Sequence, residues 1–226
     1  FQILLVILAA PAMGVRNAIA ARFPTRTVEK KNFEFDPSTG MIRWIDTGES
    51  EEYRLVVDGL VKAPASLTYN DLRAFPSITR TRDFHCVEGW TVPRVRWSGF
   101  LFKELLDKAE PLNEAKYVVF HALGETTAKP RGLTHYVESF KVESLLDPAQ
   151  EILMVLQKDG KPLSLERGAP LRLIAPYRLG YKSIKFVARV EFSNRKRFGW
   201  WTLFNPIYTW EAAVSKRRLR KGQGER

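Results

Sequence analysis

The feature of this sequence that most constrains its fold is a regular alternation of residue types late in the chain. From Ile184 to Phe192, apolar residues occupy every second position, and lysine, arginine and glutamate fill the positions between them, apart from Val187. Successive side chains of a β-strand point to opposite faces of a sheet, so the pattern predicts a strand over 184–192 with one buried face. A strand of this kind needs neighbours, and the chain is therefore expected to form a sheet.

Shorter patterns predict further strands separated by short helices. The expected strands span residues 53–57, 79–86, 117–122, 151–157 and 163–174. Asp159-Gly160 is a hairpin turn signal between the last two of these strands. A helix is expected after Thr68, whose spacing to Asp71 is that of a capping box, and another over 99–109. Short helices scattered among many strands predict the α+β class, with mixed β-sheets, in preference to a doubly wound α/β sheet.

The two ends of the chain differ in composition from its body. Residues 1–14 are apolar except for Gln2, and Ala18-Ile19-Ala20 offers a small-residue cleavage site. Residues 1–22 are therefore interpreted as a signal-peptide remnant or a truncated membrane anchor, and either interpretation predicts a periplasmic or otherwise exported domain. Residues 215–226 form a basic C-terminal tail, which is either a solvated terminus or a membrane-surface contact. Residues 23–214 are predicted to form the main domain.

Charge and cysteine content narrow the function classes. The formal net charge is +11, which favours anionic partners such as phosphates, nucleic acid or acidic lipid without choosing among them. Cys86 is the single cysteine of the sequence, so it can form no disulfide within this chain, no multi-cysteine zinc site and no iron–sulfur cluster. The sequence also lacks the C-x-x-C-H motif of haem attachment.

The first candidate site is the end of the strand predicted at 79–86. Cys86 lies at the tip of this strand, with His85 before it and Glu88 two residues after it. Loops at strand ends are common places for functional sites. A thiolate at such a place could serve as a nucleophile or as a soft metal ligand, and a buried structural cysteine is the third alternative.

The second candidate site spans residues 168–185. This segment combines two glycines and a serine with the cations Arg172, Arg178, Lys182 and Lys185. Cations and backbone amides freed by glycine are what a phosphate group needs. The spacing matches no P-loop and no dinucleotide fingerprint, so a basic, solvated strand edge stays open as the alternative.

Taken together and in this order, the two blocks resemble the sulfite oxidase-like, molybdopterin-dependent oxidoreductases. Within that family they are most similar to the branch of bacterial periplasmic methionine sulfoxide reductase catalytic subunits. The resemblance extends from Tyr53 to Trp210. The matching motifs are Cys86-Val87-Glu88-Gly89-Trp90, Trp97-Ser98-Gly99-Phe100, residues 115–120, residues 168–173, residues 180–185 and Asn205-Pro206-x-Tyr208.

The resemblance implies a sulfite oxidase-like molybdopterin-binding fold and a molybdenum–molybdopterin cofactor. It implies that Cys86 is the thiolate ligand of the metal and that Glu88 beside it is a catalytic candidate. The residues that it implies for binding the pterin and its phosphate are Arg172, Ser183, Ile184 and Lys185, with Asn32 and Arg167 as further cofactor contacts. The family has Glu-Thr where this sequence has His121-Ala122, so one cofactor contact is replaced.

The activity implied by this resemblance is oxygen-atom transfer on a small substrate or a protein sulfoxide. Electrons would be exchanged with a separate redox protein, and the resemblance suggests a membrane haem subunit. A sulfite-oxidising enzyme of the same fold is the alternative, although the arginine-rich run of true sulfite oxidases is absent. If the substrate is sulfite, Arg94 and Arg96 are the expected anion contacts.

Two interpretations from other classes were also weighed. A basic nucleic-acid-binding protein is compatible with the charge, but no nucleic-acid motif is recognised, so no nucleic-acid partner is expected. A hydrolase could instead pair Cys86 with His121 or His135.

Overall fold

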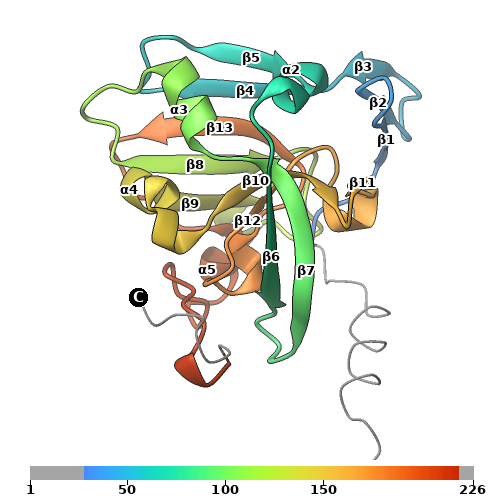
Figure 1. The fold of residues 1–226 in the computed structure, drawn as a ribbon. Coiled ribbons are helices and arrows are strands. Elements are labelled where there is room, and N and C mark those ends of the chain that lie inside the picture. Colours follow the sequence, from blue (N-terminus) through green and yellow to red (C-terminus); the bar gives the residue numbers. More distant parts are fainter. Residues whose placement is uncertain (1–27, 219–226) are drawn as a thin grey trace, which may run out of the picture.

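Strands from distant parts of the sequence form the first five-stranded sheet of this computed structural model (Figure 1). β13 (Val187–Ser193) lies at its centre, parallel to β4 (Arg54–Gly59) and antiparallel to β8 (Tyr117–Ala122). β5 (Ala65–Thr68) and β9 (Val137–Lys141) form the two edges. The structure describes residues 28–218, so segment 1–22 and most of the basic tail lie outside the described residues.

The strand predicted over 184–192 begins later than the alternation indicated. β13 starts at Val187, because Phe186 adopts a left-handed φ of 56° and the register with β8 shifts between Val187 and Arg189. Phe186 and Val187 are both fully buried, which breaks the expected two-sided pattern. Residues 184–186 therefore belong to a buried loop before the strand.

The second five-stranded sheet contains a long hairpin that extends to the lower edge of the molecule in Figure 1. Its strands are β6 (Ile78–His85), β7 (Thr91–Phe100), β10 (Leu153–Lys158), β11 (Lys161–Pro162) and β12 (Arg172–Ile174). β7 pairs with β6 and β10, and β10 also pairs with β11 and β12. The turn at Asp159-Gly160 is confirmed, but the strand expected over 163–174 is limited to β12.

The helix expected over 99–109 is also shorter than predicted. Gly99 ends β7, and a Cβ atom there would lie 1.9 Å from the carbonyl oxygen of Met154, so glycine permits the close pairing of β7 with β10. The helix itself, α3, spans Lys103–Ala109. The capping box at Thr68 and Asp71 is confirmed and starts α2 (Tyr69–Ala74).

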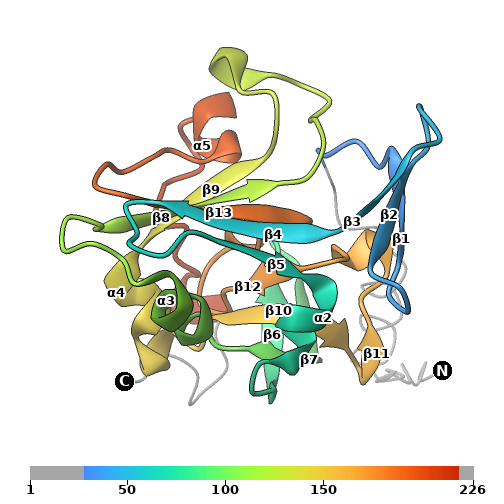
Figure 2. The same ribbon diagram turned by 90° about the horizontal axis from the view of Figure 1, so that it is seen from above.

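Smaller elements surround the two large sheets. A three-stranded sheet, with strands β1 (Phe33–Asp36), β2 (Met41–Trp44) and β3 (Ser50–Glu52), lies at one edge of the view from above (Figure 2). The remaining α-helices are α4 (Val142–Leu146) and α5 (Trp200–Phe204). Within residues 28–218, no helix has the length and apolar character needed to cross a bilayer. Mixed sheets with short helices confirm the α+β prediction.

The apolar core joins these layers. A large cluster includes Tyr53, Leu55 and Val57, which confirms the alternation predicted there, together with side chains from every sheet. A smaller cluster lies against β7 and includes Trp97. The guanidinium carbon of Arg172 lies 5.0 Å from the centre of the Trp97 ring, so the fold brings the second candidate segment against the hairpin that carries Cys86.

Candidate cofactor site

Cys86 is placed by the tight turn that joins β6 to β7. The last ladder pair is His85 with Thr91, and the turn is closed by hydrogen bonds from the Cys86 amide to Trp90 and from the Gly89 amide to the Cys86 carbonyl. Gly89 has a φ of 93°, which only glycine adopts without strain. The prediction of a cysteine at the tip of a strand is confirmed, and its side chain is partly buried.

The Cys86 turn forms one side of a pocket whose volume, counted to its open mouth, is about 700 Å³. Its wall is mainly aromatic and apolar, and it also includes cations and carboxylates. The lining residues that matter here are Glu29, Phe84, Cys86, Glu88, Tyr136, Arg172, Ser183, Ile184, Lys185, Trp201 and Tyr208.

Arg172 is the innermost cation of the pocket and is only 3% exposed. It donates hydrogen bonds to the carbonyl oxygens of Arg167 (2.8 Å) and Ser183 (3.0 Å). Its Nε is buried and has no hydrogen-bond partner within the described chain. Burial, with repulsion from Arg167, lowers the pKa of Arg172 to about 9, so the pocket contains a cation that is poorly compensated.

Lys185 lies in the same wall and is 7% exposed. Burial, followed by repulsion from Arg172, lowers the pKa of its amine to about 7, although the field of Glu29 opposes this shift. Gly168 is packed against it: φ at Gly168 is 98°, and a Cβ atom there would lie 2.8 Å from Cγ of Lys185. The glycine noted in the sequence therefore makes room for the lysine side chain.

Ser183 and Ile184 connect these two cations through the backbone. The Ser183 hydroxyl accepts a hydrogen bond from the amide of Ala175 (3.1 Å), and the Ile184 carbonyl accepts one from the amide of Leu173. Both residues are buried and line the pocket. The loop before β13 is thus held against β12, and Arg172, Ser183, Ile184 and Lys185 are brought together as the sequence predicted.

The other residues singled out in the sequence lie at the mouth of the pocket or outside its lining. Glu88 lines the mouth of the pocket, where its side chain is exposed and accepts a hydrogen bond from the Trp90 indole (3.3 Å). Arg167 does not line the pocket, but its carbonyl binds Arg172 and its charge lowers the pKa of Lys185. Asn32 is also outside the lining and donates to Asp46 (3.3 Å).

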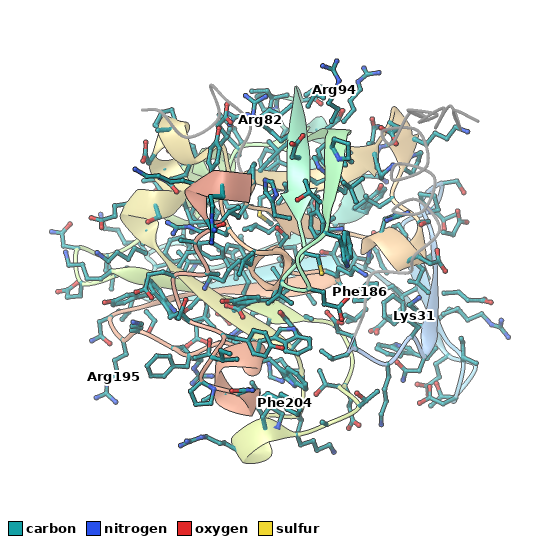
Figure 3. All side chains as sticks on the ribbon, turned by 90° about the horizontal axis from the view of Figure 1, so that it is seen from below. Lys31, Arg82, Arg94, Phe186, Arg195 and Phe204 are labelled. Carbon is teal, nitrogen blue, oxygen red and sulfur yellow. The ribbon has the colours of Figure 1, made fainter. Side chains whose placement is uncertain are left out.

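The histidines and the arginines of the hairpin do not enter the pocket. His85 is hydrogen-bonded to Thr91 (2.9 Å), and His121 bonds His135 (2.8 Å) on the other sheet, so neither His121 nor His135 lines the pocket with Cys86 as the hydrolase interpretation requires. Arg94 and Arg96 are exposed, and Arg94 points outward from the hairpin in Figure 3.

Pocket residues without an assigned role in the sequence include Glu29, Tyr136 and Tyr208. Tyr208 lay in a recognised motif, whereas Glu29 and Tyr136 follow no pattern from which a pocket position could be predicted. Tyr136 donates a hydrogen bond to the Tyr181 carbonyl (2.6 Å), which holds an aromatic wall opposite the hairpin.

Fold and pocket together define a molybdopterin-binding oxidoreductase domain. Residues 42–201 match the family described as the oxidoreductase molybdopterin binding domain, and the chain belongs to that family. Among curated relatives, it is 29% identical over 164 residues to the protein-methionine-sulfoxide reductase catalytic subunit MsrP of Campylobacter jejuni. That alignment covers 70% of this chain and 54% of the relative.

A solved structure supports the same fold. The sulfane dehydrogenase SoxCD from Paracoccus pantotrophus superimposes with a TM-score of 0.55 at 18% identity, covering 86% of this chain and 56% of that one. This confirms the predicted sulfite oxidase-like fold. The chain spans about half the length of either protein.

Proposed function

We propose that this chain holds a molybdenum–molybdopterin cofactor in the pocket, with Cys86 as the thiolate ligand of the metal, and catalyses oxygen-atom transfer at sulfur. One observation carries the proposal: a thiol and a poorly compensated buried cation line the same cavity. A thiolate suits a soft metal, and a desolvated guanidinium suits a phosphate. The two together fit a group that contains both a metal and a phosphate.

The residues divide the work of binding. Arg172 and Lys185 hold the anionic end of the cofactor, and the backbone of Ser183 and Ile184 keeps both cations in place. Asn32 and Arg167 act from outside the lining, Arg167 through its charge on the phosphate end. When bound, the cofactor supplies the two-electron redox chemistry, while the protein orients it and limits access of water.

A neutral sulfoxide is the substrate class that this pocket favours. Glu88, two residues from Cys86, places a carboxylate on its wall, and this charge would repel an anion such as sulfite. Arg94 and Arg96, which could have attracted sulfite, are exposed and outside the lining. The aromatic wall of Tyr136, Trp201 and Tyr208 suits the apolar flanks of a small or protein-bound sulfoxide.

Glu88 is proposed as the catalytic group of the protein. Reduction of a sulfoxide to a sulfide takes two electrons and two protons and releases water. Glu88 lies at the mouth of the pocket, where it can exchange protons with solvent and pass them to the departing oxygen.

The electrons are proposed to come from a separate protein. Cys86 is the single cysteine, and the sequence has no haem-attachment motif. The name of MsrP identifies that relative as a catalytic subunit. A membrane haem protein outside the cytoplasm, in the periplasm of a bacterium, is the proposed source, and export of this chain is part of the same proposal.

Metal analysis and paired assays test the proposal. Protein isolated with its cofactor should contain about one molybdenum per chain and should reduce sulfoxides with a reduced dye faster than it oxidises sulfite. Cys86→Ser should abolish turnover and lower metal content while the circular dichroism spectrum stays unchanged. Full turnover by Cys86→Ser would refute the ligand assignment. Sulfite oxidation that is lost in Arg94→Ala or Arg96→Ala would move the chain to the sulfite-oxidising branch.

A further inference from the structure

Exposed apolar side chains gather around α5. Phe198, Phe204 and Ile207 are 49%, 56% and 76% exposed, and they lie within one stretch of ten residues. Large apolar side chains that are exposed singly are ordinary, but a cluster of them marks a surface that binds a partner. Ile45 is another strongly exposed large apolar residue. It follows β2, far from this stretch in the sequence, and serves as a comparison.

The chain segment that carries these three residues is basic and contains no acidic residue. From Asn194 to Trp210 there are three basic residues, Arg195, Lys196 and Arg197, and no acidic residue. A hollow joins this stretch to Arg131 near β9, because Arg131, Lys196, Arg197 and Phe198 all line it. Within residues 28–218, no salt bridge joins any of these four cations to a carboxylate.

We propose that this surface binds an anionic phospholipid bilayer. This surface, the basic apolar patch, consists of Phe198, Phe204 and Ile207 with Arg131, Arg195, Lys196 and Arg197. Apolar side chains that project from a basic surface can enter the headgroup region while the cations meet lipid phosphates. Figure 3 shows Arg195 and Phe204 on the same side of the molecule, away from Arg94.

Aromatic rings support the cations of the patch. The Lys196 ammonium lies 4.2 Å from the centre of the Trp210 ring and 5.2 Å from that of Phe198. Aromatic rings with basic side chains beside them are typical of the level where headgroups meet acyl chains. An acidic protein partner would also satisfy the cations, but three exposed apolar side chains, with Ile207 76% exposed, provide little of the flat, packed area that a protein interface needs.

The patch adjoins the mouth of the cofactor pocket. Trp201 and Tyr208 line that pocket, and the Trp201 ring contacts those of Phe204 and Tyr208 at centre distances of 6.1 and 5.0 Å. Contact of the patch with a bilayer therefore brings the pocket mouth to the membrane surface. Lipid binding is independent of the proposed oxidoreductase activity and can succeed or fail without it.

Hydrogen–deuterium exchange of the full chain tests this proposal locally. The probes are vesicles made of equal parts phosphatidylcholine and phosphatidylglycerol, compared with vesicles of phosphatidylcholine alone. Residues 195–208 should be protected by the anionic vesicles and not by the neutral ones. Because protection is read on these peptides, any contribution of the apolar segment 1–22 to overall binding does not enter the result.

Matched variants separate the patch from charge in general. Ile207→Ser and a triple Arg195→Gln, Lys196→Gln, Arg197→Gln variant should lose the protection, whereas Ile45→Ser should keep it. The triple variant should weaken local binding roughly a hundredfold, since each basic side chain near an anionic surface contributes about a fivefold gain in affinity. A control with three exposed cations removed elsewhere changes Arg73, Lys108 and Lys161 to glutamine and should stay protected.

Two outcomes would overturn the proposal. One is equal protection by neutral and anionic vesicles, or protection that survives in both patch variants. The other is protection by a soluble acidic haem protein with none from either vesicle, which would identify the surface as a protein interface.

Discussion

Lys182 and Arg172 are two buried cations of the same chain segment with opposite surroundings. Lys182 is 2% exposed and Arg172 is 3% exposed. The Lys182 ammonium lies 2.9 Å from the Glu138 carboxylate, which is itself buried, and donates to the Ser139 carbonyl (2.6 Å). Arg172 bonds two carbonyl oxygens and no carboxylate, and its Nε is left without a partner in the described chain.

The difference distinguishes Lys182, a buried charge that is paired within the fold, from Arg172, which is proposed to bind a ligand. Burial lowers the pKa of Lys182 and raises that of Glu138, but each partner's charge opposes the shift of the other, so the pair balances itself. Arg172 is hydrogen-bonded to no carboxylate, and burial lowers its pKa to about 9 although the field of Glu29 opposes the shift. A poorly compensated buried cation is unfavourable, and under the proposed function an anion from outside the protein would complete its site.

Breaking the buried ion pair between Lys182 and Glu138 should have the largest effect on the free energy of unfolding. Lys182→Met leaves Glu138 buried without its cation, which typically destabilises by about 3–5 kcal/mol. Urea unfolding of the cofactor-free chain measures the loss. The double variant Lys182→Met, Glu138→Leu removes both charges and should recover much of it, and a double variant as unstable as the single one would show that the pair is not self-contained.

The two pocket cations, Arg172 and Lys185, should matter more for retention of the cofactor than for the free energy of unfolding. In Arg172→Met with Lys185→Met, the anionic end of the cofactor loses its partners, so retention after gel filtration should fall by the equivalent of about 2–5 kcal/mol. The free energy of unfolding of the cofactor-free chain should change less than in Lys182→Met, because removing the two cations also relieves their mutual repulsion and the cost of burying Arg172. Unchanged cofactor occupancy would place the phosphate site elsewhere.

A simple anion should stabilise the pocket that contains Arg172 and Lys185, to an extent that depends on pH. Burial lowers the pKa of Lys185 to about 7, so its amine is mostly protonated below that pH and mostly neutral above it. Sulfate stays doubly charged, and its stabilisation of the cofactor-free chain should be about 1–2 kcal/mol larger near pH 6 than near pH 8. Thermal unfolding at matched ionic strength measures this, and Lys185→Met should abolish the dependence on pH. Equal stabilisation at both pH values would contradict the assignment.

A smaller effect is expected from a partly exposed pair near the hairpin. Hydrogen bonding to Arg82 lowers the pKa of Glu151 from 4.5 to about 2. The folded pKa is below the unfolded one, so this stability is complete above pH 4.5 and is lost as pH falls toward 2. Arg82→Gln should flatten the acid slope of the unfolding free energy in this window. Lys103→Gln, at an exposed helix pair, is the control that should change little.

Local patterns predicted those elements whose cause is local. The capping box at Thr68 and the strand over 117–122 agree with the structure, because hydrogen bonding by a cap involves neighbouring residues and a short apolar run is typical of a strand buried on both faces. The strand β7 was not predicted: its apolar residues are interrupted by arginines and a proline, and pairing with β6 and β10 stabilises it instead.

The candidate site likewise contains residues that the sequence could identify and residues that it could not. Cys86 and the 168–185 segment were recognisable because their residue types are chemically distinctive, and the structure brings Cys86, Arg172 and Lys185 to one pocket. Tyr136 could not have been selected, because its packing beside the pocket depends on the whole fold. Arg94 and Arg96 were expected near an anion only if the substrate is sulfite, and the hairpin leaves both exposed and outside the pocket lining.

By itself, the sequence determined the α+β class, the strand that ends in Cys86 and the presence of a cation-rich segment that suits a phosphate. Only the tertiary structure decided which cation is paired within the core and which lines the pocket. Lys182 and Lys185 are three residues apart with the same side chain, yet one meets Glu138 and the other enters the pocket. The physical reason is that the cost of a buried charge depends on groups brought close by folding, and Glu138 reaches Lys182 from a strand far away in the sequence.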